Sequence, residues 1–306
     1  MTTTFNTMPT SALRRLLVRR PIIAAAAVAL ALALGACSMI KLGYGQAAPL
    51  AFRWLDRYAD FDDAQSLRVR SALYETLAWH RRTQLPDYVQ LLARAEAEIE
   101  GEATPERMCA WGDEIRSRAE PLIDHVAPVV AEVMVTLSPR QLSRIETRFA
   151  ENDDKYRDEH LQRNPERRRK AEVRREIERA ELLYGALGAS QRDLIVQSVA
   201  VSPFSAELAL AEREARQQDF LRLARRLGET VPAPDDAALQ VRAYLHGLVR
   251  SPRDDYRRHA ERVRVHQCAL ASALHNAASE AQRRAAARRL AGWRADLREL
   301  AGEAAG

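Results

Sequence analysis

Residues 137–160 read LSPRQLSRIETRFAENDDKYRDEH, and their spacing decides the fold class. Ser138 and Pro139 are typical of a helix start, because serine caps a free backbone N–H and proline lacks the N–H that a first turn leaves unpaired. A stripe of residues three and four positions apart follows and occupies one helical face. The members of this stripe are Leu142, Ile145, Phe149, Asn152 and Tyr156. The stretch therefore predicts a helix over 138–161.

A second stripe with the same kind of spacing follows the helix-start pair Asn164-Pro165. Its members are Val173, Ile177, Ala180, Tyr184 and Leu187. Two such helices joined by a short turn are expected to pack on each other as an antiparallel hairpin. The residues between the stripes, 155–176, carry nine basic and five acidic side chains. The sequence thus predicts a long, charged central hairpin.

The rest of the chain after the N-terminal leader also predicts helices, because Ala, Leu, Arg and Glu dominate it. No segment alternates apolar and polar residues as a half-buried strand would. We expect helices over 48–58, 62–82, 86–100, 105–135, 138–161, 165–186, 189–200, 205–227, 234–249, 253–277 and 279–302. The predicted fold is all-α, a multi-helix array of antiparallel helical hairpins.

The leader, residues 11–37, reads SALRRLLVRRPIIAAAAVALALALGAC. Two arginine pairs precede the uncharged and mostly apolar run 22–34, which is too short to cross a bilayer and is typical of a secretory signal. The run ends in Leu34-Gly35-Ala36-Cys37, which resembles the lipobox of bacterial lipoproteins. A simple cleaved signal with an incidental cysteine remains the alternative.

The lipobox resemblance implies cleavage before Cys37, a diacylglycerol and acyl chains on that cysteine, and anchoring in a membrane. Ser38 implies sorting to the outer membrane. We therefore expect a signal peptide over 1–36, a lipid-anchored tether over 37–47, and one helical domain over 48–306 on the periplasmic face.

Charge and cysteine content exclude several classes of protein. The net charge is +5, and four of these charges are arginines of residues 1–36, which hold no acidic residue. The remainder is nearly neutral and lacks the positive excess that nucleic-acid binding uses. In an oxidising compartment Cys109 and Cys268 are expected either to form one disulfide or to stay as buried thiols. We expect no metal site and no cofactor.

A helix-start motif recurs along the chain. Leu137-Ser138-Pro139-Arg140-Gln141 and Leu187-Gly188-Ala189-Ser190-Gln191 share the form Leu-x-x-x-Gln, and Phe61-Asp62-Asp63-Ala64-Gln65 is a looser copy. A capping box accounts for the spacing, because glutamine at the third helical position can reach back to the N-cap. The motif also resembles the LTxxQ pattern of periplasmic stress chaperones of the Spy and CpxP type. That resemblance implies a helical cradle that holds unfolded clients without ATP.

The chain as a whole resembles an uncharacterised family of proteobacterial outer-membrane lipoproteins. The resemblance rests on residues 41–44, 54–58, 61–65, 79–86, 149–152 and 202–204. It implies no known activity.

Two groups of residues are candidates for a functional site. Arg167, Arg168 and Arg169 at the hairpin tip are expected either to meet an anionic partner, such as lipid phosphates, lipopolysaccharide or an acidic envelope protein, or to form a solvated helix face with local ion pairs. The second group, which can bind or cleave a cell-wall glycan if its carboxylates lie close together, comprises Trp54, Asp56, Asp63, Trp79 and His80. The alternative for this group is core packing and helix capping.

No catalytic motif is present, so we expect no enzyme. The function that the sequence favours is a lipid-anchored envelope protein that binds a partner, in the manner of a chaperone. A glycan-binding or glycan-cleaving protein is the alternative.

Overall fold

The computed structural model of the protein describes residues 39–302. The leader and Cys37 lie outside the described residues. The chain divides into two compact units, residues 1–46 and 47–306. The described part of the first unit contains helix α2 (Met39–Gly45), which lies in the segment expected to be a tether.

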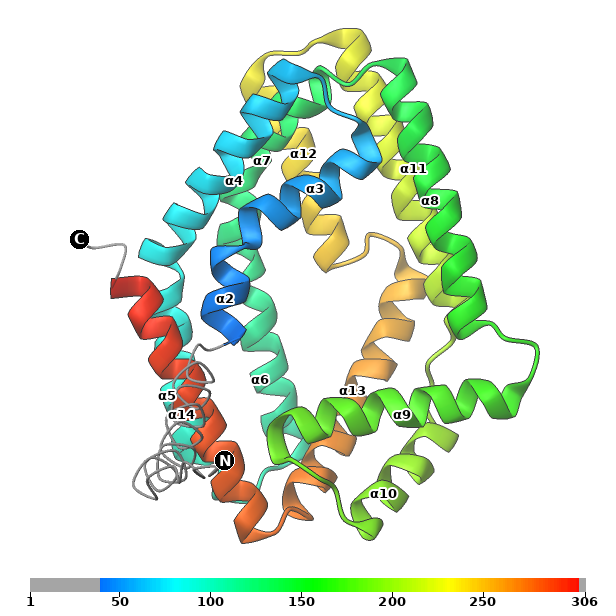
Figure 1. Ribbon diagram of the computed structural model, residues 1–306. Coiled ribbons are helices and arrows are strands. Elements are labelled where there is room, and N and C mark those ends of the chain that lie inside the picture. Colours follow the sequence, from blue (N-terminus) through cyan, green and yellow to red (C-terminus); the bar gives the residue numbers. More distant parts are fainter. Residues whose placement is uncertain (1–38, 303–306) are drawn as a thin grey trace, which may run out of the picture. The chain divides into compact units, whose positions relative to one another are not determined.

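The predicted all-α fold class is confirmed, because residues 39–302 form helices and contain no strand (Figure 1). The helices of the second unit are α3 (Ala47–Ala59), α4 (Asp63–Thr83), α5 (Leu85–Glu98), α6 (Pro105–Ser117), α7 (Ala119–Val135), α8 (Pro139–His160), α9 (Pro165–Tyr184), α10 (Ala189–Ala200), α11 (Ala206–Thr230), α12 (Pro234–Val249), α13 (Asp254–Asn276) and α14 (Glu280–Gly302). Thr104, Ser138 and Asn164 cap their helices with side-chain oxygens, and a proline follows each of them.

The segment 105–135 is two helices, not the single helix that its composition predicts. α6 ends at Ser117 and α7 begins at Ala119. Pro121 explains the break, because its ring lacks an N–H and clashes with the carbonyl four residues earlier, that of Ser117. The predicted boundaries of the other helices agree with the structure to within a few residues.

The predicted packing of α8 on α9 is wrong. α8 packs on α3 and α11, whereas α9 packs on α10 and α14. The first stripe enters one core cluster, through Leu142 and Ile145, and the second stripe enters another, through Tyr184 and Leu187. A stripe shows which face of a helix is buried and not which helix covers it, and here other helices cover both stripes.

The second unit has two lobes, each built from three pairs of consecutive helices. Lobe 1 contains α3–α4, α7–α8 and α11–α12, around a core that includes Met134, Leu221 and Val241. Lobe 2 contains α5–α6, α9–α10 and α13–α14, around a core that includes Ile195 and Leu274. Consecutive helix pairs therefore alternate between the lobes along the chain (Figure 1).

The two lobes share five helix–helix contacts, whereas the packing of α11 on α7 and α12 in lobe 1 is not repeated to the same extent in lobe 2. In lobe 1, α3 contacts α4 and α8, α4 contacts α7, α7 contacts α12, and α8 contacts α11. In lobe 2, α9 contacts α10 and α14, α10 contacts α13, α13 contacts α6, and α14 contacts α5. Each contact of the first set has its counterpart in the second when α3, α4, α7, α8, α11 and α12 are matched with α9, α10, α13, α14, α5 and α6.

A pair of capping boxes lies at the centre of lobe 1. The Oε1 atoms of Gln65 and Gln141 accept the backbone N–H groups of Asp62 and Ser138, at 3.1 and 2.9 Å. The two glutamines also bond to each other, with Gln141 Nε2 donating to Gln65 Oε1 at 2.6 Å. Their Nε2 atoms further donate to backbone carbonyls across the junction, from Gln65 to Thr136 and from Gln141 to Asp60. The two helix starts are thus joined to each other.

Lobe 2 repeats this arrangement with Gln191 and Gln282. Gln191 Oε1 accepts the N–H of Gly188 at 2.9 Å, and Gln282 Oε1 accepts the N–H of Ser279 at 3.0 Å. The two amides again exchange hydrogen bonds, at 2.9 and 3.2 Å. The box at Ser279–Gln282 was missed in the sequence because alanine stands where the other copies have Leu or Phe. Its Ser-x-x-Gln spacing was the available signal.

These pairs predict a specific pattern of energetic coupling. Gln65→Ala and Gln141→Ala should each lower the free energy of unfolding by about 1–3 kcal/mol, because each leaves buried polar groups without partners. The double variant should lose at least about 1 kcal/mol less than the sum of the two, since both substitutions break the same bonds. Urea denaturation followed by circular dichroism measures this.

Gln65→Ala combined with Gln191→Ala is the matched control, since these glutamines lie in different lobes and should be additive to within about 0.5 kcal/mol. Equal coupling in both double variants would mean that the glutamine pairs do not act as local units.

Candidate functional site

The structure does not bring the predicted glycan residues to one place. Trp54 on α3 is about half exposed and packs against Tyr58, with ring centroids 4.8 Å apart. Asp56 uses its carboxylate to accept the N–H of Phe61 at 3.0 Å. Asp63 begins α4 and is exposed.

Trp79 and His80 lie at the far end of α4 from Asp63, about 24 Å along the helix axis at 1.5 Å per residue. Trp79 stacks on His125 of α7, with parallel rings whose centroids are 4.0 Å apart. Burial lowers the pKa of His80. A glycosidase holds its two carboxyl groups within about 5–9.5 Å of each other, at a single bond of its substrate. Asp56 and Asp63 both lie near the connection between α3 and α4, whereas Trp79 and His80 lie at the other end of α4. A glycan site at the two carboxylates stays a prediction.

The basic tip of the predicted hairpin lies at the start of α9. Arg167 and Arg169 are exposed, whereas Arg168 lines a small cavity together with three acidic residues. These acids are Glu159, Glu172 and Glu207. These acids offset the charges of Arg168 and Arg175 inside the cavity. Glu159 and Glu172 are already included in the count for 155–176, so the fold adds only Glu207 to it.

A stronger concentration of positive charge lies between α6, α11 and the first half of α13. We call it the arginine groove; it has a volume of about 920 Å³. Its arginines are Arg116, Arg216, Arg250, Arg257, Arg258, Arg262 and Arg264, and its acidic lining residues are Asp113 and Glu261. The positive side chains therefore outnumber the negative ones by five.

Two of these arginines form no ion pair with the described residues of the chain. Asp113 and Glu261 pair with Arg116 and Arg264 inside the groove. By contrast, Arg250 and Arg262 are exposed and have no ion-pair partner among residues 39–302.

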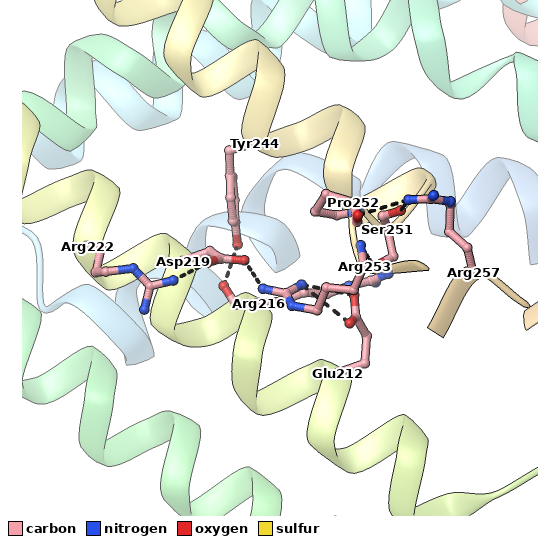
Figure 2. A network of polar contacts seen from close by, with 9 residues as sticks. All are labelled: Glu212, Arg216, Asp219, Arg222, Tyr244, Ser251, Pro252, Arg253 and Arg257. Carbon is pink, nitrogen blue, oxygen red and sulfur yellow. Dashed lines mark hydrogen bonds and ion pairs between the residues drawn. The ribbon is translucent and has the colours of Figure 1, made fainter. Parts of the chain in front are cut away.

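A network of charged side chains lies beside the groove (Figure 2), and its members Arg216, Ser251 and Arg257 also line the groove. Glu212 of α11 is 4% exposed and accepts hydrogen bonds from Arg216 at 2.6 Å and from Arg253 at 3.3 Å. Asp219 accepts hydrogen bonds from Arg222 and Arg253. Because Arg253 lies in the connection between α12 and α13, the network fixes that connection to α11.

Burial disfavours the charged form of Arg253, but its hydrogen bonds to Asp219 and Glu212 and their negative charges outweigh this effect and raise its pKa. The network continues along the connection. Arg257 donates to the backbone carbonyls of Ser251 and Pro252, at 3.1 and 2.9 Å. Arg216 and Arg253 are thus held in place by acids, and Arg257 by backbone carbonyls.

A disulfide joins Cys109 of α6 to Cys268 of α13, across 159 residues of sequence. Asp113 and Arg264 lie one helical turn from these cysteines on the same two helices, and they pair at 3.2 Å. The disulfide therefore holds together the two helices that form one end of the arginine groove.

Local sequence could not reveal this groove, because its arginines come from helices that are distant in the chain. The segment 250–264 was the available signal, since it carries six arginines and three acidic residues. In the described part of the chain, no group of three or more His, Cys, Asp or Glu side chains is placed to hold a metal ion. Within residues 39–302 no single helix is long and apolar enough to cross a membrane, although the bent pair Pro105–Val135 and Pro139–His160 passes by length and composition.

The network makes Glu212→Gln a destabilising substitution. It removes the charge that Arg216 and Arg253 share in a partly buried position, so the free energy of unfolding should fall by about 2–3 kcal/mol. Thermal or urea denaturation measures the change.

Glu214→Gln is the control, because Glu214 lies on the same helix with its side chain 44% exposed in a pair with Arg157. It should cost less than about 1 kcal/mol. Equal losses in the two variants would contradict a structural role for the buried network.

Comparison with known proteins gives one match. The model of a family of unknown function matches residues 57–231, more than half of the chain. The matched region contains both capping boxes of lobe 1 and the first box of lobe 2. No curated protein matches the chain. No solved structure matches it.

Proposed function

The chain belongs to the family of unknown function DUF6279, and from that premise we propose that it is a lipid-anchored envelope protein that holds segments of other polypeptides, in the manner of a chaperone. Membership in this family confirms the resemblance to an uncharacterised family and assigns no activity. The proposal therefore depends on the architecture of the lobes and on the leader.

The observation that carries the proposal is the pairing of the capping boxes. The motif that resembles the LTxxQ pattern occurs in pairs, and each pair joins two helix starts through reciprocal glutamine bonds. A capping box that served only its own helix would need no partner. The reciprocal pairing, present once in each lobe, favours an architectural relationship to the helical cradles of the Spy and CpxP type.

Exposed apolar side chains support the holding of polypeptides. Leu67 and Tyr74 lie seven residues apart on α4 and are 73% and 61% exposed. Leu50 and Trp54 lie four residues apart on α3 and are each about half exposed. Residues at these spacings share one helical face. Unfolded chains expose apolar segments, which such faces can bind through the hydrophobic effect.

The location follows from the leader and belongs to the proposal. The lipobox-like residues 34–37 favour a diacylglycerol and acyl chains, including palmitate, on Cys37. Several acyl chains bind a membrane far more firmly than one, since each buried CH₂ contributes about 0.8 kcal/mol. With Ser38 after the cysteine, we place the protein at the periplasmic face of the outer membrane.

Holding activity is tested on the full protein in lipid nanodiscs. An unfolded client is diluted into the sample, and light scattering follows its aggregation. We expect suppression near an equimolar ratio, without ATP, and no suppression by empty nanodiscs. Asp193→Asn should leave the suppression unchanged, because Asp193 is exposed on α10 and lies outside the apolar faces of α3 and α4. Undiminished aggregation of several clients, with the protein shown to be folded, would refute the holding function.

Anchoring is tested separately by Cys37→Ser. We expect this variant to lose metabolic labelling with palmitate and to leave the outer-membrane fraction, because serine offers no thiol for lipidation. Ala36→Ser is the matched control, since it keeps the cysteine and a small residue before it. Continued palmitate labelling of the Cys37→Ser protein would contradict the lipobox assignment.

A further inference from the structure

We propose that the arginine groove is a binding site for acidic segments of polypeptides. This inference rests on the proposed polypeptide-holding function and names the chemistry of the segments that one surface takes. Its first support is charge, because the lining arginines outnumber the lining acids by five. The excess is two when the acids paired with Arg216, Arg257 and Arg258 are also counted. Carboxylates are complementary to such a lining, and the planar guanidinium group binds them with two parallel hydrogen bonds.

The two groove arginines that have no ion-pair partner within residues 39–302 show where an acidic ligand would bind. Arg250 lies at the end of α12 and Arg262 on α13, and both line the groove. Neither has an ion-pair partner among residues 39–302, so a ligand carboxylate need not displace an internal acid to reach them. Arg216, in contrast, already bonds to Glu212, whose negative charge offsets its own.

The groove is also held in shape before a ligand arrives. Arg253 ties the connection before α13 to Glu212 and Asp219 of α11, and the Cys109–Cys268 disulfide ties α13 to α6. A site whose walls are already fixed loses less conformational entropy on binding. This favours a binding surface over a solvated patch of mobile arginines.

The form of the groove favours a polypeptide over a compact anion. Leu248 and Val249 line it beside the arginines and are each 37% exposed. Through Arg216 and Leu248 it continues into a second groove between α11 and α12, which adds Leu223 and Tyr244. An extended segment that carries acidic and apolar side chains can use both the arginines and these apolar positions. A single phosphate would use the arginines alone.

The test measures the binding of a fluorescein-labelled oligo-glutamate peptide to the full protein in phosphatidylcholine nanodiscs, by fluorescence anisotropy. We expect binding that weakens with salt, and no binding of oligo-lysine. The double variant Arg250→Glu/Arg262→Glu should lower the affinity at least about tenfold, because it reverses two charges that face the ligand. Circular dichroism checks that it is folded.

The matched control is Arg288→Glu/Arg298→Glu, which makes the same change in net charge. Both residues are exposed on α14, outside the groove, and neither has an ion-pair partner within residues 39–302. The affinity of this control should change less than about twofold. The tip variant Arg167→Glu/Arg169→Glu compares the groove with the other basic surface.

Absence of oligo-glutamate binding, equal losses in the groove and α14 variants, or a loss confined to the tip variant would each overturn the proposal. Binding of phosphatidylglycerol vesicles at the groove without binding of the peptide would also overturn it. The holding assay, run in parallel with the wild type, separates the two ideas. Holding without peptide binding removes the groove assignment only, whereas groove-dependent peptide binding without holding removes the proposed function and leaves an acidic-ligand site.

Discussion

In each lobe, two glutamine side chains exchange hydrogen bonds and thereby fix the start of one helix against the start of another. Gln65, Gln141 and Gln191 are less than a tenth exposed, so their amides must find partners inside the protein. Each Oε1 accepts its own N-cap N–H, and each Nε2 reaches across the junction. This requirement sets the relative position of helices that are far apart in the chain, and the remaining helices of each lobe pack on the pair so formed.

Local interactions made most of the helices predictable. Pro139 and Pro165 mark helix starts because the reason lies within one turn of sequence. The partners of α8 and α9 were not predictable, since the same stripes suit any apolar neighbour. Each capping box can be predicted from a four-residue spacing, but the pairing of its glutamine with a second one cannot. The two glutamines of a pair lie 76 or 91 residues apart in the sequence.

The candidate sites show the same limit for charge. Counting along the chain gave residues 155–176 nine basic and five acidic side chains, and folding brings one further acid, Glu207 of α11, into the cavity that Arg168 lines. At the arginine groove, Arg116 and Arg216 join the arginines of 250–264 from other helices, and each has an acid beside it, Asp113 and Glu212. The electrostatic field at a surface depends on every charge that is near it in space, whereas a count along the sequence includes only charges that are near in the chain.

The alternation of helix pairs between the lobes also decides when the chain can fold. α5 packs against α14, and α6 is bonded to α13 across 159 residues. Because the chain is synthesised from its N-terminus, lobe 1 cannot complete its packing until α12 has been released. Lobe 2 cannot complete its packing until α14 has been released. Such long-range contacts slow folding. The delay leaves the apolar faces of the early helices unburied until most of the chain has been released, so both lobes complete their packing late.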